Sequence, residues 1–379
     1  MRTRDLGIVI GRGQPGPGNA ITDVAGVRVG HATIIEGDGP LVVGRGPVRT
    51  GVTVVVPRAD DRWNEPVYAG CHRLNGNGEM TGLEWVRESG KLTTPVAITN
   101  THSVGIVRDA LVAVSVERAD ARVDHWSLPV VGETYDGLLN DINGFHVRVE
   151  HLRAALAAAA GGPVAEGNVG GGTGMVCHEF KGGIGTASRV IPADRGGFTV
   201  GVLVQANYGK RAWLRVDGVP VGQEIGVDDV SSPHDSLGAA PGPGPGSGSI
   251  IVVVATDAPL LPHQCERLAQ RAGLGIARAG GTGGHTSGDL FIAFATGNDL
   301  PPDDEDRPSV RIDAVRSAGD GTIDALFDGA IEATEEAIVN ALVAAETMVG
   351  RDGITAHALP HGRLMEVMGR YGRGGAAAR

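Results

Sequence analysis

The chain has 379 residues, of which 41% are hydrophobic and 20% are charged, and its formal net charge is −11. This composition is typical of a soluble globular protein with one large or two ordinary domains. The acidic balance argues against nucleic acid or an anionic membrane surface as a partner. Glycine accounts for 61 residues, without a three-residue period, so many tight turns are expected.

The sequence also gives expectations about compartment and metal content. No stretch is long and apolar enough to span a bilayer, and the N-terminus lacks the apolar core of a signal peptide. The three cysteines, Cys71, Cys177 and Cys265, are odd in number and far apart, which argues against a disulfide framework or a Cys-rich zinc site. We therefore expect a cytoplasmic protein without a catalytic metal.

Strands and helices are predicted from the spacing of apolar residues. In chain order, the patterns indicate a strand at 51–57, a strand at 95–100, a helix at 151–160, strands at 198–205 and 249–255, a helix at 261–272, a strand at 290–295 and a helix at 322–348. Asp257 is the expected cap of the second helix, with Pro259 just inside it. The absence of a regular strand–helix alternation favours stacked sheets flanked by helices, an α+β arrangement.

Two glycine-rich segments, 170–174 and 280–284, superficially resemble phosphate-binding loops. Neither has the spacing of a dinucleotide fingerprint, and neither is followed by the Gly-Lys-Ser/Thr of a P-loop. We interpret both as tight turns and predict no nucleotide cofactor. Cys177 is adjacent to His178, and neighbours on an extended chain point to opposite sides, so a buried structural cysteine is favoured over a thiol nucleophile.

The junction between Gly248 and Ser249 is the most informative feature. Alternating prolines and glycines at 241–248 cannot hold a helix or a central strand, whereas 249–255 is a β-branched run suited to a buried strand. Ser249 is then either the end of an ordinary linker or a nucleophile. In the second case it cuts the preceding peptide bond and works from a new N-terminus.

Eight stretches, in order over nearly the whole chain, decide between these interpretations. They are GPGNAITDV at 16–24, LNGNGE at 74–79, TNTH at 99–102, GETYDG at 132–137, EGNVGGGTG at 166–174, QANYG at 205–209, GSIIVVVATDAP at 248–259 and SGD at 287–289. With these motifs the chain resembles the DmpA-type family of L-aminopeptidase/D-esterase-amidases, which includes the β-peptidyl aminopeptidases. The resemblance implies an αββα sandwich, similar to N-terminal-nucleophile hydrolases but with distinct connectivity.

Carried onto this sequence, the resemblance places a self-cleavage between Gly248 and Ser249. The products would be chains 1–248 and 249–379, which together form one catalytic domain. Cleavage would give Ser249 a free α-amine with an ordinary pKa near ~8. One residue would then supply both the nucleophile and its base, so no Ser-His-Asp set is required.

Other roles are implied by the resemblance, and each has a plainer alternative. Asn207 would donate its side-chain amide to the oxyanion and Tyr135 would donate its phenol, instead of being a turn residue and an ordinary half-buried tyrosine. Glu133 would bind the substrate ammonium group instead of being a solvated surface residue. Ser287 and Asp289 would orient the new amine and relay protons, instead of serving as cap or turn residues. Some family members have Glu where this chain has Asp289.

The sequence therefore predicts a self-processing serine aminopeptidase that acts on small peptides, amino-acid amides or esters through an acyl-enzyme, without a cofactor. The resemblance implies a homo-oligomer of the cleaved pair, a tetramer. Two alternatives stay open. One is an acyltransferase similar to the glutamate/ornithine acetyltransferases, which have Thr at the junction, and the other is an uncut, non-enzymatic small-molecule binding protein.

Overall fold

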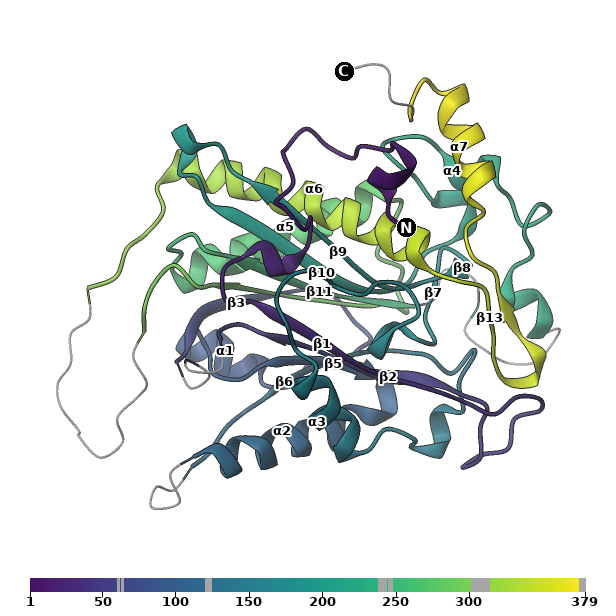
Figure 1. Cartoon of the computed structure of the whole chain (residues 1–379), viewed down its shortest axis with the longest axis horizontal. Helices are drawn as coiled ribbons and strands as arrows, with labels where there is room; N and C mark the ends of the chain where they lie inside the picture. The colour runs from purple at the N-terminus through teal and green to yellow at the C-terminus, as the bar shows by residue number, and fades with distance from the viewer. Residues whose placement is uncertain are drawn as a thin grey trace.

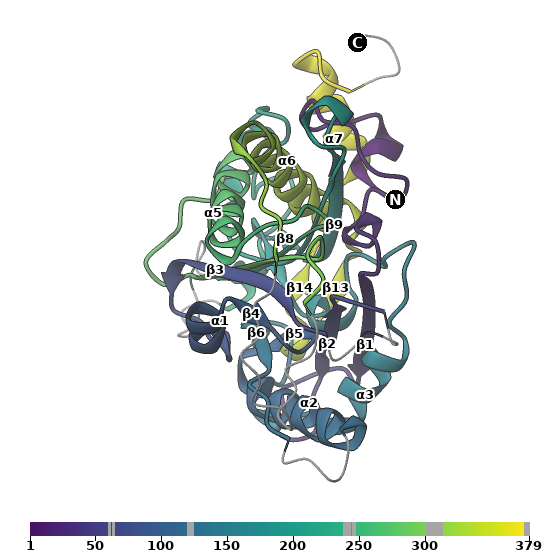
Figure 2. The same cartoon turned by 90° about the vertical axis from the view of Figure 1, so that its left-hand side faces the viewer.

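Four layers are stacked in the protein: helices, a six-stranded sheet, a four-stranded sheet and further helices (Figures 1 and 2). The computed structural model describes residues 1–59, 62, 65–119, 125–237, 244, 248–300 and 314–374. The two sheets lie face to face, and each carries its helices on the opposite face. The arrangement is the predicted αββα sandwich.

The six-stranded sheet has the order β4-β3-β12-β11-β10-β9. Its strands are β3 (Val67–Gly76), β4 (Lys91–Leu92), β9 (Gly183–Val190), β10 (Thr199–Asn207), β11 (Ser249–Thr256) and β12 (Gly288–Ala295). Strand β11 lies in the middle of this sheet and is buried over its whole length. It pairs antiparallel with β10 and parallel with β12, so its first residue is held on both sides.

The four-stranded sheet has the order β1-β2-β5-β6. Its strands are β1 (Arg28–Glu36), β2 (Val48–Val56), β5 (Val96–Asn100) and β6 (Val130–Thr134). Two short hairpins complete the described strands, namely β7 (Val176–Cys177) with β8 (Phe180–Lys181), and β13 (Met348–Val349) with β14 (Thr355–Ala356). The first of these hairpins lies next to the end of β10 and contributes to the site described below.

The helices divide between the two outer layers. Helices α5 (Pro262–Arg278) and α6 (Asp320–Ala344) cover the six-stranded sheet, and α2 (Val104–Arg118) and α3 (Val149–Ala157) cover the four-stranded sheet (Figure 1). The shorter helices are α1 (Leu83–Ser89), α4 (Val221–Glu224) and α7 (His361–Arg370). Within the described part of the chain, none of the helices has both the length and the apolar character needed to cross a membrane.

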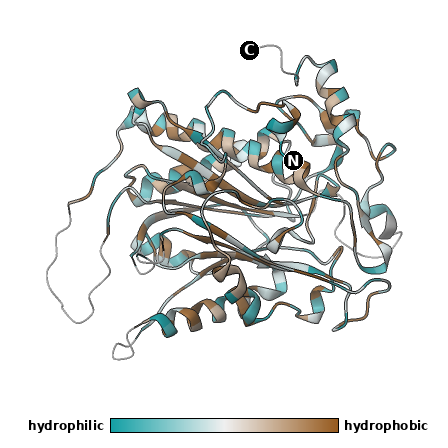
Figure 3. Cartoon of the chain, in the orientation of Figure 1, coloured by the Kyte–Doolittle hydropathy of each residue, from teal (hydrophilic) through white to brown (hydrophobic). Residues whose placement is uncertain are grey.

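The side chains of β11 alternate between the two hydrophobic cores that lie on either face of the six-stranded sheet. Ile250, Val252 and Val254 pack into the core beneath α5 and α6, whereas Ile251 and Val253 pack into the core between the two sheets. Successive side chains of a strand point to opposite faces, so a continuous apolar run is required where both faces are covered. Figure 3 shows the corresponding hydrophobic colour along the strands of both sheets.

The predicted elements agree with the structure at five strands, which are β2, β5, β10, β11 and β12, and at three helices, which are α3, α5 and α6. Two details are wrong. Helix α5 begins at Pro262 after Leu261, so Asp257 is not its cap and instead accepts a hydrogen bond from the Thr199 N–H at 2.7 Å. Helix α6 ends at Ala344, because the chain there turns into β13. Most of the Pro/Gly run at 241–248 lies outside the described residues.

Candidate active site

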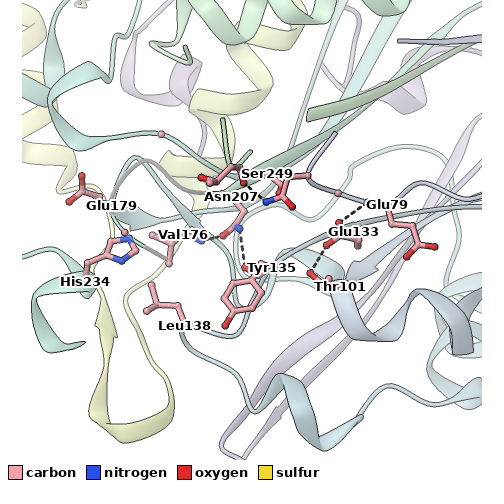
Figure 4. A pocket seen from close by; sticks show the side chains of 16 residues that line it. Glu79, Thr101, Glu133, Tyr135, Leu138, Val176, Glu179, Asn207, His234 and Ser249 are labelled. Atoms are coloured by element: carbon pink, nitrogen blue, oxygen red, sulfur yellow. Dashed lines mark hydrogen bonds between the residues drawn. The ribbon is translucent and has the colours of Figure 1, made fainter. Parts of the chain in front are cut away.

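A cavity of about 730 Å³ opens where β10 ends and β11 begins. Ser249, the first residue of β11, lies opposite Asn207, the last residue of β10, and beside Gly288 of β12. Ser249 and Asn207 line the cavity together with Tyr135 and Glu133 (Figure 4). The two sheets therefore bring together residues that lie more than 100 positions apart in the sequence.

Ser249 is buried, with 5% of its surface exposed. The Gly288 N–H lies 3.2 Å from Ser249 Oγ and also 3.2 Å from the carbonyl oxygen of Gly248. Gly248 has φ +150°, and a Cβ there would lie 2.1 Å from the carbonyl oxygen of Asn207, so only glycine fits this close approach. The peptide bond before Ser249 is thus held with its carbonyl polarised by the same N–H that contacts the serine hydroxyl.

The side-chain amide of Asn207 is fixed by two hydrogen bonds. Its Oδ1 accepts from the Val176 N–H at 2.8 Å, and its Nδ2 donates to the carbonyl oxygen of Tyr135 at 2.9 Å. A carboxamide has a second N–H, so Asn207 retains a donor for a ligand. Asn207 belongs to strand β10, and the plainer interpretation as a turn residue is wrong.

Tyr135 follows β6 and is half-buried. Its phenol lies against Gly137, where a Cβ would come within 2.4 Å of Tyr135 Oη. In Figure 4 the ring extends from the Asn207 side toward Leu138, away from Ser249. Burial raises the pKa of the phenol. The atom that contacts Asn207 is the main-chain carbonyl oxygen, and a role of the phenol as an oxyanion donor stays a prediction.

Glu133 lies on β6 and is 2% exposed, so it is not a solvated surface residue. Its Oε1 accepts a hydrogen bond from the Glu79 N–H at 2.9 Å, and its Oε2 accepts one from the Thr101 hydroxyl. Burial raises the pKa of this carboxyl, and the two donors oppose that shift. A buried carboxylate on a cavity wall is suited to bind a cation.

Ser287 and Asp289 flank Gly288, whose N–H contacts Ser249. Ser287 Oγ donates to Asp289 Oδ1 at 2.6 Å, and Asn75 Nδ2 donates to Asp289 Oδ2 at 3.0 Å. Both members of the pair are buried, and burial raises the pKa of Asp289. The pair therefore meets on one side of the chain, as the spacing of two residues predicts, next to the Ser249 backbone.

Comparison with known proteins identifies the family of this chain. The sequence model of peptidase family S58 matches residues 19–356. The chain belongs to this family. It is 51% identical to the beta-peptidyl aminopeptidase BapA of Sphingosinicella microcystinivorans, over 99% of this chain and 94% of that protein. The predicted resemblance and the assignment as a serine aminopeptidase-type hydrolase are confirmed.

Solved structures with the same architecture support the same family assignment. A beta-aminopeptidase from Burkholderia sp. has a TM-score of 0.87 and 56% identity, covering 98% of this chain and 99% of its own. The L-aminopeptidase D-Ala-esterase/amidase of Ochrobactrum anthropi has a TM-score of 0.89 and 48% identity, covering 99% of each chain. The latter is described as a prototype of the serine aminopeptidases and a new variant of the Ntn hydrolase fold, which confirms the predicted fold class.

Sequence reasoning assigned no role to several residues around the cavity. Thr101 lies in a recognised motif but gave no sign that it would hold Glu133. Glu179 lies on the cavity wall at the tip of the β7–β8 hairpin, with φ +62°, and its Oε1 accepts from the Arg211 N–H at 2.9 Å. A lone glutamate carries no signal of such a position. Among the described residues, no group of three or more His, Cys, Asp or Glu side chains could hold a metal ion.

Proposed function

We propose that this peptidase cleaves itself between Gly248 and Ser249 and then removes N-terminal residues from small peptides, amino-acid amides or esters. The observation that carries the proposal is the position of the Gly288 N–H, which contacts both the carbonyl oxygen of Gly248 and Ser249 Oγ. The hydroxyl, the carbonyl and a hydrogen-bond donor are thereby gathered at one peptide bond, opposite Asn207.

In the self-cleavage, Ser249 Oγ attacks the carbonyl carbon of Gly248 and the Gly288 N–H stabilises the negative charge that forms on the oxygen. The C–N bond then breaks, which leaves Gly248 esterified to Ser249 Oγ and releases the α-amine of Ser249. Water hydrolyses the ester, giving a free carboxylate on Gly248 and a free hydroxyl on Ser249. The products would be residues 1–248 and 249–379.

In turnover, the substrate ammonium group binds Glu133, and the carbonyl carbon next to it is attacked by Ser249 Oγ. The α-amine of Ser249 takes the hydroxyl proton and passes it to the leaving amine, while Asn207 Nδ2 donates to the oxyanion. Tyr135 is the second donor, and for this role its phenol has to turn toward Ser249 from the orientation in Figure 4. Water then hydrolyses the acyl-enzyme. Ser287 and Asp289 would orient the amine.

The substrate class follows from the relatives and from the cavity. Two of them, at 51% and 56% identity, are named as beta-peptidyl or beta-aminopeptidases, which favours N-terminal β-amino acids. The buried carboxylate of Glu133 favours an unblocked amine. We also propose a cytoplasmic location, supported by three free, buried cysteines, and a tetramer of the cleaved pair, which light scattering of the purified enzyme would test.

Intact-mass analysis tests the first step. Wild type should give two chains of 248 residues and 379 − 248 = 131 residues, and Ser249→Ala should remain one chain without aminopeptidase activity. Ser247→Ala is the matched control because it changes the neighbouring serine of the same Gly-Ser-Gly-Ser segment, and it should still be cleaved. Cleavage of Ser249→Ala at the same bond would show that another residue or a contaminating protease is responsible.

A further inference from the structure

Lys181 is a fully buried cation outside the catalytic set, with none of its surface exposed. Its Nζ donates to three main-chain carbonyl oxygens, those of Gly172 at 3.2 Å, Met175 at 2.9 Å and Gly182 at 2.8 Å. Burying an ammonium group is costly unless it is well satisfied. A lysine in this position therefore calls for a reason beyond packing.

The reason lies in the peptide group between Met175 and Val176. Its carbonyl oxygen accepts from Lys181 Nζ at 2.9 Å, and its N–H donates to Asn207 Oδ1 at 2.8 Å. Asn207 in turn donates through Nδ2. Lysine, peptide group and carboxamide thus form one chain of hydrogen bonds, in which each group donates to the next and Asn207 donates last. Hydrogen bonds arranged in this way polarise one another.

We propose that Lys181 is a positioning residue for the oxyanion donor Asn207. By fixing the Met175–Val176 peptide, it keeps the Val176 N–H on Asn207 Oδ1, which leaves only the amide nitrogen to face the cavity. Its charge also strengthens the Nδ2–H as a donor, through two polarised amide groups. This inference rests on the proposed function, in which Asn207 stabilises the oxyanion.

Loss of the proton from Lys181 would remove the effect of its charge on the Asn207 donor, but would not change the orientation of Asn207. Burial lowers the pKa of the ammonium group to about 7, and the neighbouring Cys177 thiol acts in the opposite direction. The carbonyl oxygens of Gly172, Met175 and Gly182 favour the charged form because they present their negative ends to Nζ. A neutral amine keeps two N–H donors, so it can still donate to Met175 and to one other of these oxygens, and the orientation of Asn207 is kept in both forms.

A double-mutant cycle tests the proposal. Lys181→Met removes the donors and the charge, and we expect kcat to fall about tenfold with KM changed by less than about twofold, a fraction of the 10²–10³ typical of losing an oxyanion donor. In an Asn207→Ala background the same substitution should lower kcat by less than about twofold, because the chain of hydrogen bonds is already interrupted. Rates are expressed per cleaved molecule, from intact mass.

A second measurement distinguishes a loss of Asn207 positioning from a general loss of order in the active site. The affinity of Lys181→Met for a boronic acid analogue, which forms a tetrahedral adduct with Ser249 Oγ, should fall about tenfold. The affinity for the corresponding amino alcohol, which binds by its ammonium group, should change by less than about twofold. Arg189→Met is the control at a second buried cation. Arg189 donates to the carbonyl oxygens of Ser188 and Ile10 and is paired with Glu332 and Glu336. Its loss should lower the unfolding midpoint without changing kcat.

Lys181→Gln retains two N–H donors without the charge, so its kcat should lie between those of wild type and Lys181→Met. It serves as the test where Lys181→Met does not fold or cleave itself. A wild-type kcat in a folded Lys181 variant would overturn the proposal, as would an undiminished tenfold loss in the Asn207→Ala background. These failures are distinct from failure of the proposed function. The latter would appear as an inactive wild type, or as Asn207→Ala with an unchanged kcat.

Discussion

Glu133→Gln removes one charge from the cavity and leaves its shape unchanged. The glutamine oxygen can still accept from the Glu79 N–H, and its amide can donate to the Thr101 hydroxyl, which now accepts in place of donating. The fold should therefore be kept. Removing one partner of a buried, hydrogen-bonded charge pair costs about 3–5 kcal/mol, so kcat/KM for substrates with a free ammonium group should fall by about 10² to 5 × 10³.

The acid limb of the pH profile should change in the same variant. Burial raises the pKa of Glu133, and the carboxyl becomes neutral as the pH falls through that value. Ammonium binding is then lost, so kcat/KM of wild type should begin to decline at a higher pH than an exposed glutamate would cause. Glu133→Gln should lack this decline, because it has no carboxyl group to titrate.

The assay compares each aminoacyl ester with its N-acetylated form, which carries no ammonium group. For the blocked ester, Glu133→Gln should be within about threefold of wild type, since no charge pair is lost. Glu84→Gln is the control: Glu84 is an exposed carboxylate on α1 that is not part of the described cavity lining, so the selectivity of this variant should stay that of wild type. Equal losses on free and blocked esters would refute ammonium binding by Glu133.

Three further substitutions test the rest of the site. Gly248→Ala should remain uncleaved on intact-mass analysis, because its Cβ would lie 2.1 Å from the Asn207 carbonyl oxygen; normal cleavage would contradict the close approach. Asp289→Asn should lower kcat on the order of tenfold to hundredfold in steady-state kinetics, with little change in KM, because Asp289 holds Ser287 at 2.6 Å; a dominant rise in KM would instead indicate substrate contact. Glu179→Gln should raise kcat/KM for free dipeptides relative to dipeptide amides, because the described lining of the cavity contains no Lys or Arg to balance this carboxylate; an unchanged ratio would exclude it from the leaving-group side.

Strands with a nearly continuous apolar run could be predicted from the sequence, because a run such as 250–255 is apolar at every position. Strand β9 (Gly183–Val190) could not, because four of its eight residues are Gly, Ala or Ser, and at least one of them is small for a packing reason. A Cβ on Gly185 would lie 1.9 Å from the carbonyl oxygen of Ala337 in α6. Close contact with a helix, and not β-propensity, selects the residues there, and that contact is invisible before the chain is folded.

Part of the candidate site could likewise be predicted from the sequence, and part could not. Ser249 and Asn207 lie in motifs, and their register across β10 and β11 brings them together as the resemblance implies. Lys181 and Glu179 gave no signal, because lone charged residues are usually solvated and only the β7–β8 hairpin carries these two inward. The partners that hold a functional side chain are long-range contacts, which a local pattern does not encode.

The position of the cleavage point explains why self-processing would not dismantle the enzyme. Ser249 is paired with Asn207 of β10 on one side and with Gly288 of β12 on the other, and the strand that follows is buried throughout. Breaking the bond before it removes none of these pairings. The new amine would therefore be released at a place that the central strand already fixes, within reach of the hydroxyl on the same residue. A serine at the first position of an edge strand would lack the second neighbour, and its amine would be free to fray away from the hydroxyl it has to activate.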